Sequence, residues 1–183
     1  TANIVTAAAL SNDGTMAVAG LYNGQCIFYQ TKGLKYFTQI DCRNRHGKYR
    51  KGKKVTALEF NGDGTQLLIT TNDSRLRLYD MNDYSMIAKF KGLDNDELQI
   101  KASFSADYKY VICGSEDEQT YIWDIYTDYQ SLIKKEYRND SYEYFKSNQT
   151  TSTGALFVKP QTIQYIYGHN QATEIKHLLV ICG

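Results

Sequence analysis

The densest group of ionisable side chains is a basic segment at residues 43–54, which holds seven lysines and arginines: Arg43, Arg45, Lys48, Arg50, Lys51, Lys53 and Lys54. Such a segment can bind acidic lipid headgroups or an acidic protein, because each basic residue near an anionic membrane contributes about 1 kcal/mol. A solvated loop without a dedicated ligand is the plainer alternative. Nucleic acid is disfavoured, because the net charge of the chain is only +1 and Tyr49 is the one aromatic residue in the segment.

Residues that could hold a metal ion or perform catalysis are scattered. His46, His169 and His177 lie far apart and no C-x-x-C pair occurs, so we expect neither a metal site nor a cofactor. Complete G-x-S-x-G, Walker and G-x-G-x-x-G motifs are absent, and the acidic turns at 94–97 and 116–118 lack the spacing of a calcium loop. The sequence therefore predicts no enzyme.

Exposed aromatic residues are expected near the end of the chain. Tyr142, Tyr144 and Phe145 lie in a polar stretch, 139–153, that we interpret as a loop or insertion. Tyrosines are enriched at interface hot spots, so Tyr144 and Phe145 are candidate partner-binding residues. The alternative is that they pack against the outer strand of the preceding sheet.

The positions of the cysteines and the distribution of apolar residues indicate the cellular compartment in which the chain is expected. Cys26, Cys113 and Cys182 lie inside apolar runs, and we expect buried free thiols in a reducing, cytoplasmic compartment. The N-terminus carries no apolar leader, and no run of about 18 apolar residues occurs, so neither a signal peptide nor a membrane span is expected.

The elements that must position these residues form an internal repeat. Three segments share a large apolar residue, a small polar turn and an aspartate: 10–15, 60–65 and 104–108. Further along each copy, Tyr29, Tyr79 and Trp123 fall in register. The period is therefore close to 44–50 residues.

Each copy predicts four β-strands, so the fold class is all-β. The predicted strands are 5–10, 16–20, 25–30 and 36–41, then 55–60, 66–71, 75–80 and 86–91, then 99–104, 110–114, 120–125 and 132–136. The second strand of each copy is apolar and should be buried on both faces. The third alternates, which predicts that Arg75 and Arg77 face solvent.

A fourth copy opens at 155–158, and its second strand is expected at 178–182. The predicted units are 1–42, 55–91, 99–136 and an incomplete 155–183. We expect the chain to be part of a longer protein.

An F-S-x-D turn, a period near 44 and the ending Trp123-Asp124 resemble the WD40 repeat family of β-propellers. The resemblance implies a partial propeller with about three and a half four-stranded blades. It also implies a hydrogen-bonded cluster, to which Thr71 and Asp73 in the second blade and Ser115, Asp117 and Trp123 in the third correspond. The family's Gly-His pair is missing, so packing should matter more than this network.

Three stretches, 34–40, 71–80 and 99–105, are similar to the propellers of Rab-GTPase-binding WD-repeat proteins of recycling endosomes. That similarity implies a non-catalytic protein-interaction scaffold in membrane traffic, cytoplasmic or peripheral on endosomal membranes, with a small GTPase as partner. The alternative is a propeller that carries a hydrolase site or binds carbohydrate, which would need converging acids or an aromatic shelf in a central pocket.

Overall fold

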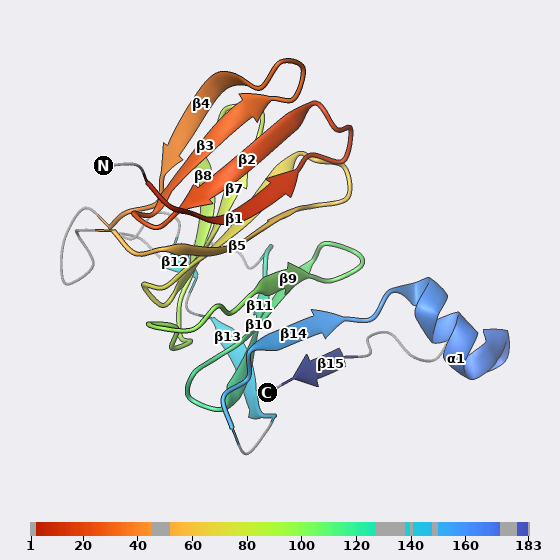
Figure 1. Cartoon of the computed structure of the whole chain (residues 1–183). Coiled ribbons are helices and arrows are strands. Elements are labelled where there is room, and N and C mark those ends of the chain that lie inside the picture. Colours follow the sequence, from red (N-terminus) through yellow and green to blue (C-terminus); the bar gives the residue numbers. More distant parts are fainter. Residues whose placement is uncertain are drawn as a thin grey trace.

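The structure, a computed structural model, describes residues 3–44, 52–126, 138–139, 141–147, 150–172 and 179–182. These residues form four β-sheets that follow one another along the chain, and a helix that extends away from them (Figure 1). The first sheet is antiparallel with the order β1-β2-β3-β4, and its strands are Val5–Leu10, Met16–Leu21, Gln25–Gln30 and Lys35–Asp41.

The second and third sheets repeat this order. The second contains β5 to β8, which are Val55–Phe60, Gln66–Thr71, Arg75–Asp80 and Met86–Phe90. A short strand, β12 (Arg138–Asn139), adds to the outer edge of β8 in parallel. The third sheet contains β9, β10, β11 and β13, which are Ala102–Phe104, Tyr110–Gly114, Gln119–Asp124 and Tyr142–Lys146.

The repeated turn between the first two strands of each sheet has a common cause. The aspartate carboxylate accepts a hydrogen bond from the backbone N–H two residues later. Thr15 donates to Asp13 Oδ1 at 3.0 Å, and Thr65 donates to Asp63 Oδ1 at 2.9 Å. The residue between them has a positive φ, which glycine adopts without strain. Tyr108 takes that place in the third turn, with φ 56°.

Two hydrophobic clusters join the three large sheets. One lies between the first and second sheets and includes Phe28, Val55 and Leu67, whereas the other lies between the second and third and includes Leu68 and Trp123. Because Leu67 and Leu68 belong to different clusters, β6 is buried on both faces, as its apolar sequence predicted. The sheets therefore pack face to face.

The outer strand of the third sheet lies at a different place in the sequence from the one predicted. The fourth strand was expected at 132–136, which lies outside the described residues, and 139–153 was expected to be a loop. Instead, β13 pairs antiparallel with β11 and β12 joins the second sheet. Polar composition concealed the period-two pattern of 142–146, in which alternate residues face opposite sides of the sheet.

The last described strands form a pair. β14 (Gly154–Phe157) is antiparallel to β15 (Leu179–Cys182), and these strands match the predicted opening of a fourth copy. Between them stands helix α1 (Pro160–Ala172), which the sequence reasoning did not predict. Cys26, Cys42 and Cys113 are buried free thiols, but Cys182 is exposed, contrary to expectation, because β15 shows alternate residues to solvent.

Candidate functional site

A buried polar cluster lies where the first sheet meets the second. Asp73 and Thr71, the two residues expected in it, share a hydrogen bond of 2.5 Å between Thr71 Oγ1 and Asp73 Oδ1. The Arg77 guanidinium donates to Asp73 Oδ2 at 2.5 Å and to Thr71 Oγ1 at 2.6 Å. Asn44, which follows the first sheet, donates to Asp73 Oδ2 at 2.6 Å. The cluster therefore ties the second sheet to the segment that leaves the first.

The electrostatics of this cluster indicate a structural role. The Arg77 and Asp73 side chains are only 2% and 4% exposed. Burial lowers the pKa of Arg77, but the hydrogen bond and ion pair with Asp73 outweigh burial, so the pKa lies above its ordinary value. Lys89 donates to Asn44 Oδ1 at 3.3 Å. The pKa of Lys89 lies below its ordinary value, mainly because the side chain is partly buried and also because the positive charge of Arg77 is near. Each charge is thus held by its neighbours rather than presented to a ligand.

The burial of Arg77 contradicts the expectation that it faces solvent. Charge alone does not identify the solvent-facing side of β7, because a buried arginine is stable where acceptors surround it. Aligned copies of the repeat place Ile27 and Tyr121 at the same position as Arg77, and those side chains indicate an inward-facing site. Arg77 can be buried there because Asp73, Thr71 and Asn44 supply acceptors for its fixed set of donors.

In the third sheet, the residues expected to form one cluster, Ser115, Asp117 and Trp123, each bond to a different partner. Ser115 Oγ accepts from the backbone N–H of Asp94 at 2.9 Å, and Asp117 Oδ2 accepts from the Tyr121 hydroxyl at 2.6 Å. The Trp123 indole N–H donates to the backbone oxygen of Lys91 at 3.0 Å. Tyr121, which the sequence reasoning did not single out, stacks on Trp123 with ring centroids 5.8 Å apart. Trp123 is therefore fixed by packing and by the connecting segment.

The basic segment is described only at its ends. Arg45, Lys48, Arg50 and Lys51 lie outside the described residues. Arg43 pairs with Asp41 at 2.5 Å, and Lys54 Nζ donates to the backbone oxygen of Glu97 at 3.0 Å. Lys53 is half-buried. The segment runs from the first sheet to the second, so it occupies the joining position that the sequence predicted.

Tyr144 and Phe145, the candidate partner-binding residues, lie on opposite faces of β13. Tyr144 pairs with Tyr121 across the strands and stacks on it at 5.6 Å, on the side that faces the second sheet. Phe145 pairs with Thr120 and faces the other way. Tyr144 is 61% exposed and Phe145 is 38% exposed. These residues belong to the outer strand itself and do not form one surface.

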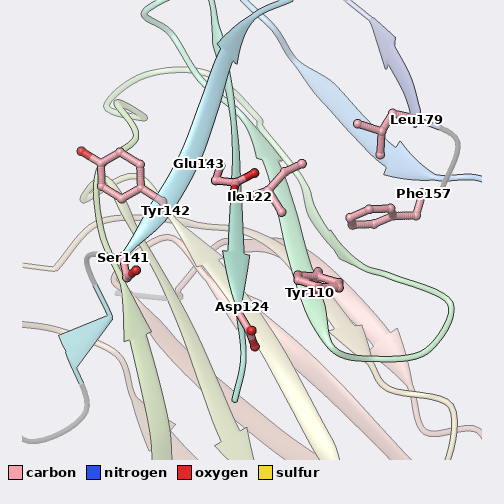
Figure 2. A pocket seen from close by; sticks show the side chains of 8 residues that line it. All are labelled: Tyr110, Ile122, Asp124, Ser141, Tyr142, Glu143, Phe157 and Leu179. Carbon is pink, nitrogen blue, oxygen red and sulfur yellow. The ribbon is translucent and has the colours of Figure 1, made fainter. Parts of the chain in front are cut away.

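A pocket with a volume of about 540 Å³ opens between the third sheet and the β14–β15 pair (Figure 2). Its lining contains both apolar and acidic side chains, among them Ile122, Phe157, Asp124 and Glu143. The position equivalent to Ile122 in the first sheet is Phe28, whose ring meets Tyr84 of the second sheet at 5.3 Å. The pocket therefore lies on a face through which a sheet packs against the next, so we assign it no catalytic role.

Metal binding and membrane insertion can be assessed for the part of the chain that the structure describes. Within it, no group of three or more histidines, cysteines or acidic residues is placed to hold a metal ion. None of its helices is long and apolar enough to span a membrane.

Comparison with known proteins addresses the repeat directly. The family model for the WD domain, G-beta repeat, matches residues 42–80 and 96–124. The chain is 44% identical over 155 residues to WD repeat-containing protein 44 from Xenopus laevis, across 84% of this chain and 17% of that protein. It is 26% identical over 120 residues to an uncharacterized WD repeat-containing protein from Schizosaccharomyces pombe, across 62% of this chain and 20% of that protein. The chain thus spans about a fifth of the length of these curated relatives.

Solved structures agree on the fold. The β-propeller domain of Cps50 (Swd1) from Myceliophteria thermophila is 16% identical to this chain and superposes with a TM-score of 0.63, over 84% of this chain and 44% of that domain. WD40 propellers typically bind other proteins and are generally non-catalytic scaffolds. Residues 42–80 and 96–124 therefore match the WD40 repeat family, and the consecutive sheets have the fold of β-propeller blades.

Proposed function

We propose that this chain is part of a non-catalytic scaffold that gathers other proteins in membrane traffic, with a small GTPase of the Rab type among its partners. The observation that carries the scaffold role is the packing of three blades into two shared cores, which leaves large aromatic side chains such as Tyr22, Tyr36 and Tyr144 on the outside. A stiff frame with exposed loops and aromatic residues suits protein recognition.

The trafficking part of the proposal has a separate basis. It rests on the similarity of 34–40, 71–80 and 99–105 to Rab-binding WD-repeat proteins. The chain would then act in the cytoplasm or at the surface of endosomal membranes.

A pull-down with immobilised small GTPases tests the GTPase partner. If the proposal is right, a Rab-type GTPase loaded with a non-hydrolysable GTP analogue retains the chain, and the same GTPase loaded with GDP retains at least tenfold less. The nucleotide is the control, because both forms share nearly all of their surface. Equal retention by the two forms across the Rab family would remove the GTPase and leave a general scaffold.

The basic segment supplies a membrane contact within the same proposal. Its seven positive charges would attract anionic lipid headgroups, at about 1 kcal/mol each. Flotation should recover the chain with phosphatidylserine vesicles but not with phosphatidylcholine vesicles, and Lys48→Glu/Arg50→Glu/Lys51→Glu should abolish recovery. Lys32→Glu/Lys35→Glu, in the turn before β4 and at the first residue of β4, is the control and should float normally. Equal flotation with both lipids would rule out an electrostatic contact.

A further inference from the structure

We propose that the face of the third blade formed by Tyr121, Tyr142 and Tyr144, with the neighbouring Asp94 and Asp117, binds an arginine-bearing segment of a partner protein. We call these five residues the tyrosine–aspartate surface. This inference rests on the scaffold role in the proposed function but does not depend on a GTPase. It names the chemistry of a partner that the scaffold would gather.

The aromatic part of the surface is a continuous set of ring contacts. Tyr144 stacks on Tyr121 at 5.6 Å with an interplanar angle of 26°, and Tyr121 stacks on the buried Trp123 at 5.8 Å and 18°. Tyr142 meets both Tyr121 and Tyr144 edge-on or tilted, at 5.2 and 6.0 Å. The inner rings hold Tyr144 in place while most of its own area faces solvent. A preformed aromatic platform of this kind costs little entropy when a ligand binds.

The acidic part lies at the phenolic end of Tyr121. The Tyr121 hydroxyl donates to Asp117 Oδ2 at 2.6 Å. Burial raises the pKa of Tyr121, and the hydrogen bond and charge of Asp117 and the charge of Asp94 raise it further. Burial raises the pKa of Asp94, and so do the charges of Asp117, Asp96 and Glu116. The charge of Arg75 opposes these effects, and the pKa of Asp94 still lies above its ordinary value. A cation brought to this place would relieve the repulsion.

The second blade shows what is different about the third. There, Asp73 is neutralised by Arg77 from the same blade, and the outer-strand residue Lys89 is half-buried and bonded to Asn44. The third blade has Tyr121 in place of Arg77 and Tyr144 in place of Lys89. Where the second blade has two bases of its own, the third has two aromatic rings. Among the described residues, the third blade supplies no base at these two equivalent positions, and we place the arginine of the partner there.

Arginine fits this surface better than lysine. Its planar guanidinium can stack on the ring of Tyr144 while its N–H groups reach a carboxylate, whereas lysine offers a compact and strongly hydrated ammonium. Lys146 does not compete for the surface, because it pairs with Glu118 at 2.9 Å. An arginine-bearing protein segment therefore matches both the stacked rings and the charge.

Fluorescence anisotropy with two labelled heptapeptides tests the proposal, one of alternating glycine and arginine and one with lysine in place of arginine. The arginine peptide should bind the chain at least fivefold more tightly than the lysine peptide. Tyr144→Ala should weaken binding of the arginine peptide about fivefold, and Asp94→Asn should also weaken it. Tyr144→Phe, which keeps the ring, should bind within twofold of the original chain.

Phe145→Ala is the matched control, because it removes a ring from the same strand on the opposite face. It should leave binding unchanged, and thermal unfolding should show that both alanine variants are folded. Equal loss in Tyr144→Ala and Phe145→Ala, equal affinity for the two peptides, or no binding of the arginine peptide would each overturn the proposal. Such a failure would not affect the nucleotide-dependent pull-down, which uses a different ligand and readout.

Discussion

Replacing Asp73 with alanine is expected to lower the free energy of unfolding by about 3–5 kcal/mol. The change leaves the Arg77 guanidinium buried between two blades without the carboxylate that neutralises it. Thr71 and Asn44 remain as acceptors, but neither carries a charge. Urea denaturation of both proteins, followed by the intrinsic fluorescence of Trp123, measures the difference.

A second variant separates the ion pair from mere loss of volume. In Asp73→Leu/Arg77→Met both charges are removed and apolar volume is kept, so the double variant should be clearly more stable than Asp73→Ala. Asp83→Ala, in an exposed turn before β8, is the control and should lose less than about 1 kcal/mol. If Asp73→Ala lost no more than Asp83→Ala, the buried cluster would not be a determinant of stability.

Trp123→Ala should have an effect of similar size, about 3–5 kcal/mol. Trp123 is fully buried in the core between the second and third blades, where its ring meets Phe90 at 5.9 Å. The substitution removes the ring and leaves the backbone oxygen of Lys91 without the indole N–H. The change also removes the one tryptophan of the chain, so unfolding must be followed by circular dichroism.

Graded replacements identify the source of this effect. Trp123→Phe keeps an aromatic ring but loses the indole hydrogen bond, so its cost should lie between that of alanine and that of the original residue. Tyr126→Ala, two turn residues away from the strand and 66% exposed, should change stability by less than about 0.5 kcal/mol. A loss for Trp123→Ala no larger than that for Tyr126→Ala would mean that the inter-blade core does not hold this ring.

The strands of the first two blades could be predicted because their sequences carry local information. The turns at Asp13 and Asp63 are set by an aspartate that bonds two residues ahead and by a glycine with positive φ. The apolar β6 indicated burial on both faces before any neighbour was known. Such features depend on residues close in the sequence, and they fix where each strand begins and ends.

The features that sequence reasoning missed depend on contacts between distant residues. Burial of Arg77 requires Asn44, which lies 33 residues earlier in the chain. The pairing of β13 with β11 spans a stretch whose composition is typical of a loop. In the tyrosine–aspartate surface the charge of Asp94 acts on Tyr121, which lies in a different segment of the chain, and neither residue belongs to a recognisable motif. Composition and periodicity describe a residue's own strand, but not the partner that makes a buried charge or a polar strand stable.

A double-mutant cycle on Gly20 and Val55 tests most directly the claim that consecutive sheets pack face to face as blades. A Cβ atom on Gly20 would lie 2.5 Å from a methyl carbon of Val55 in the next sheet, so Gly20→Ala should be destabilising by about 1–3 kcal/mol. In Gly20→Ala/Val55→Ala the smaller neighbour makes room, and the loss should be less than the sum of the single losses by about 1 kcal/mol or more. Losses that add to within about 0.3–0.5 kcal/mol would show that the two residues are not in contact, and would contradict the packing of the first blade against the second.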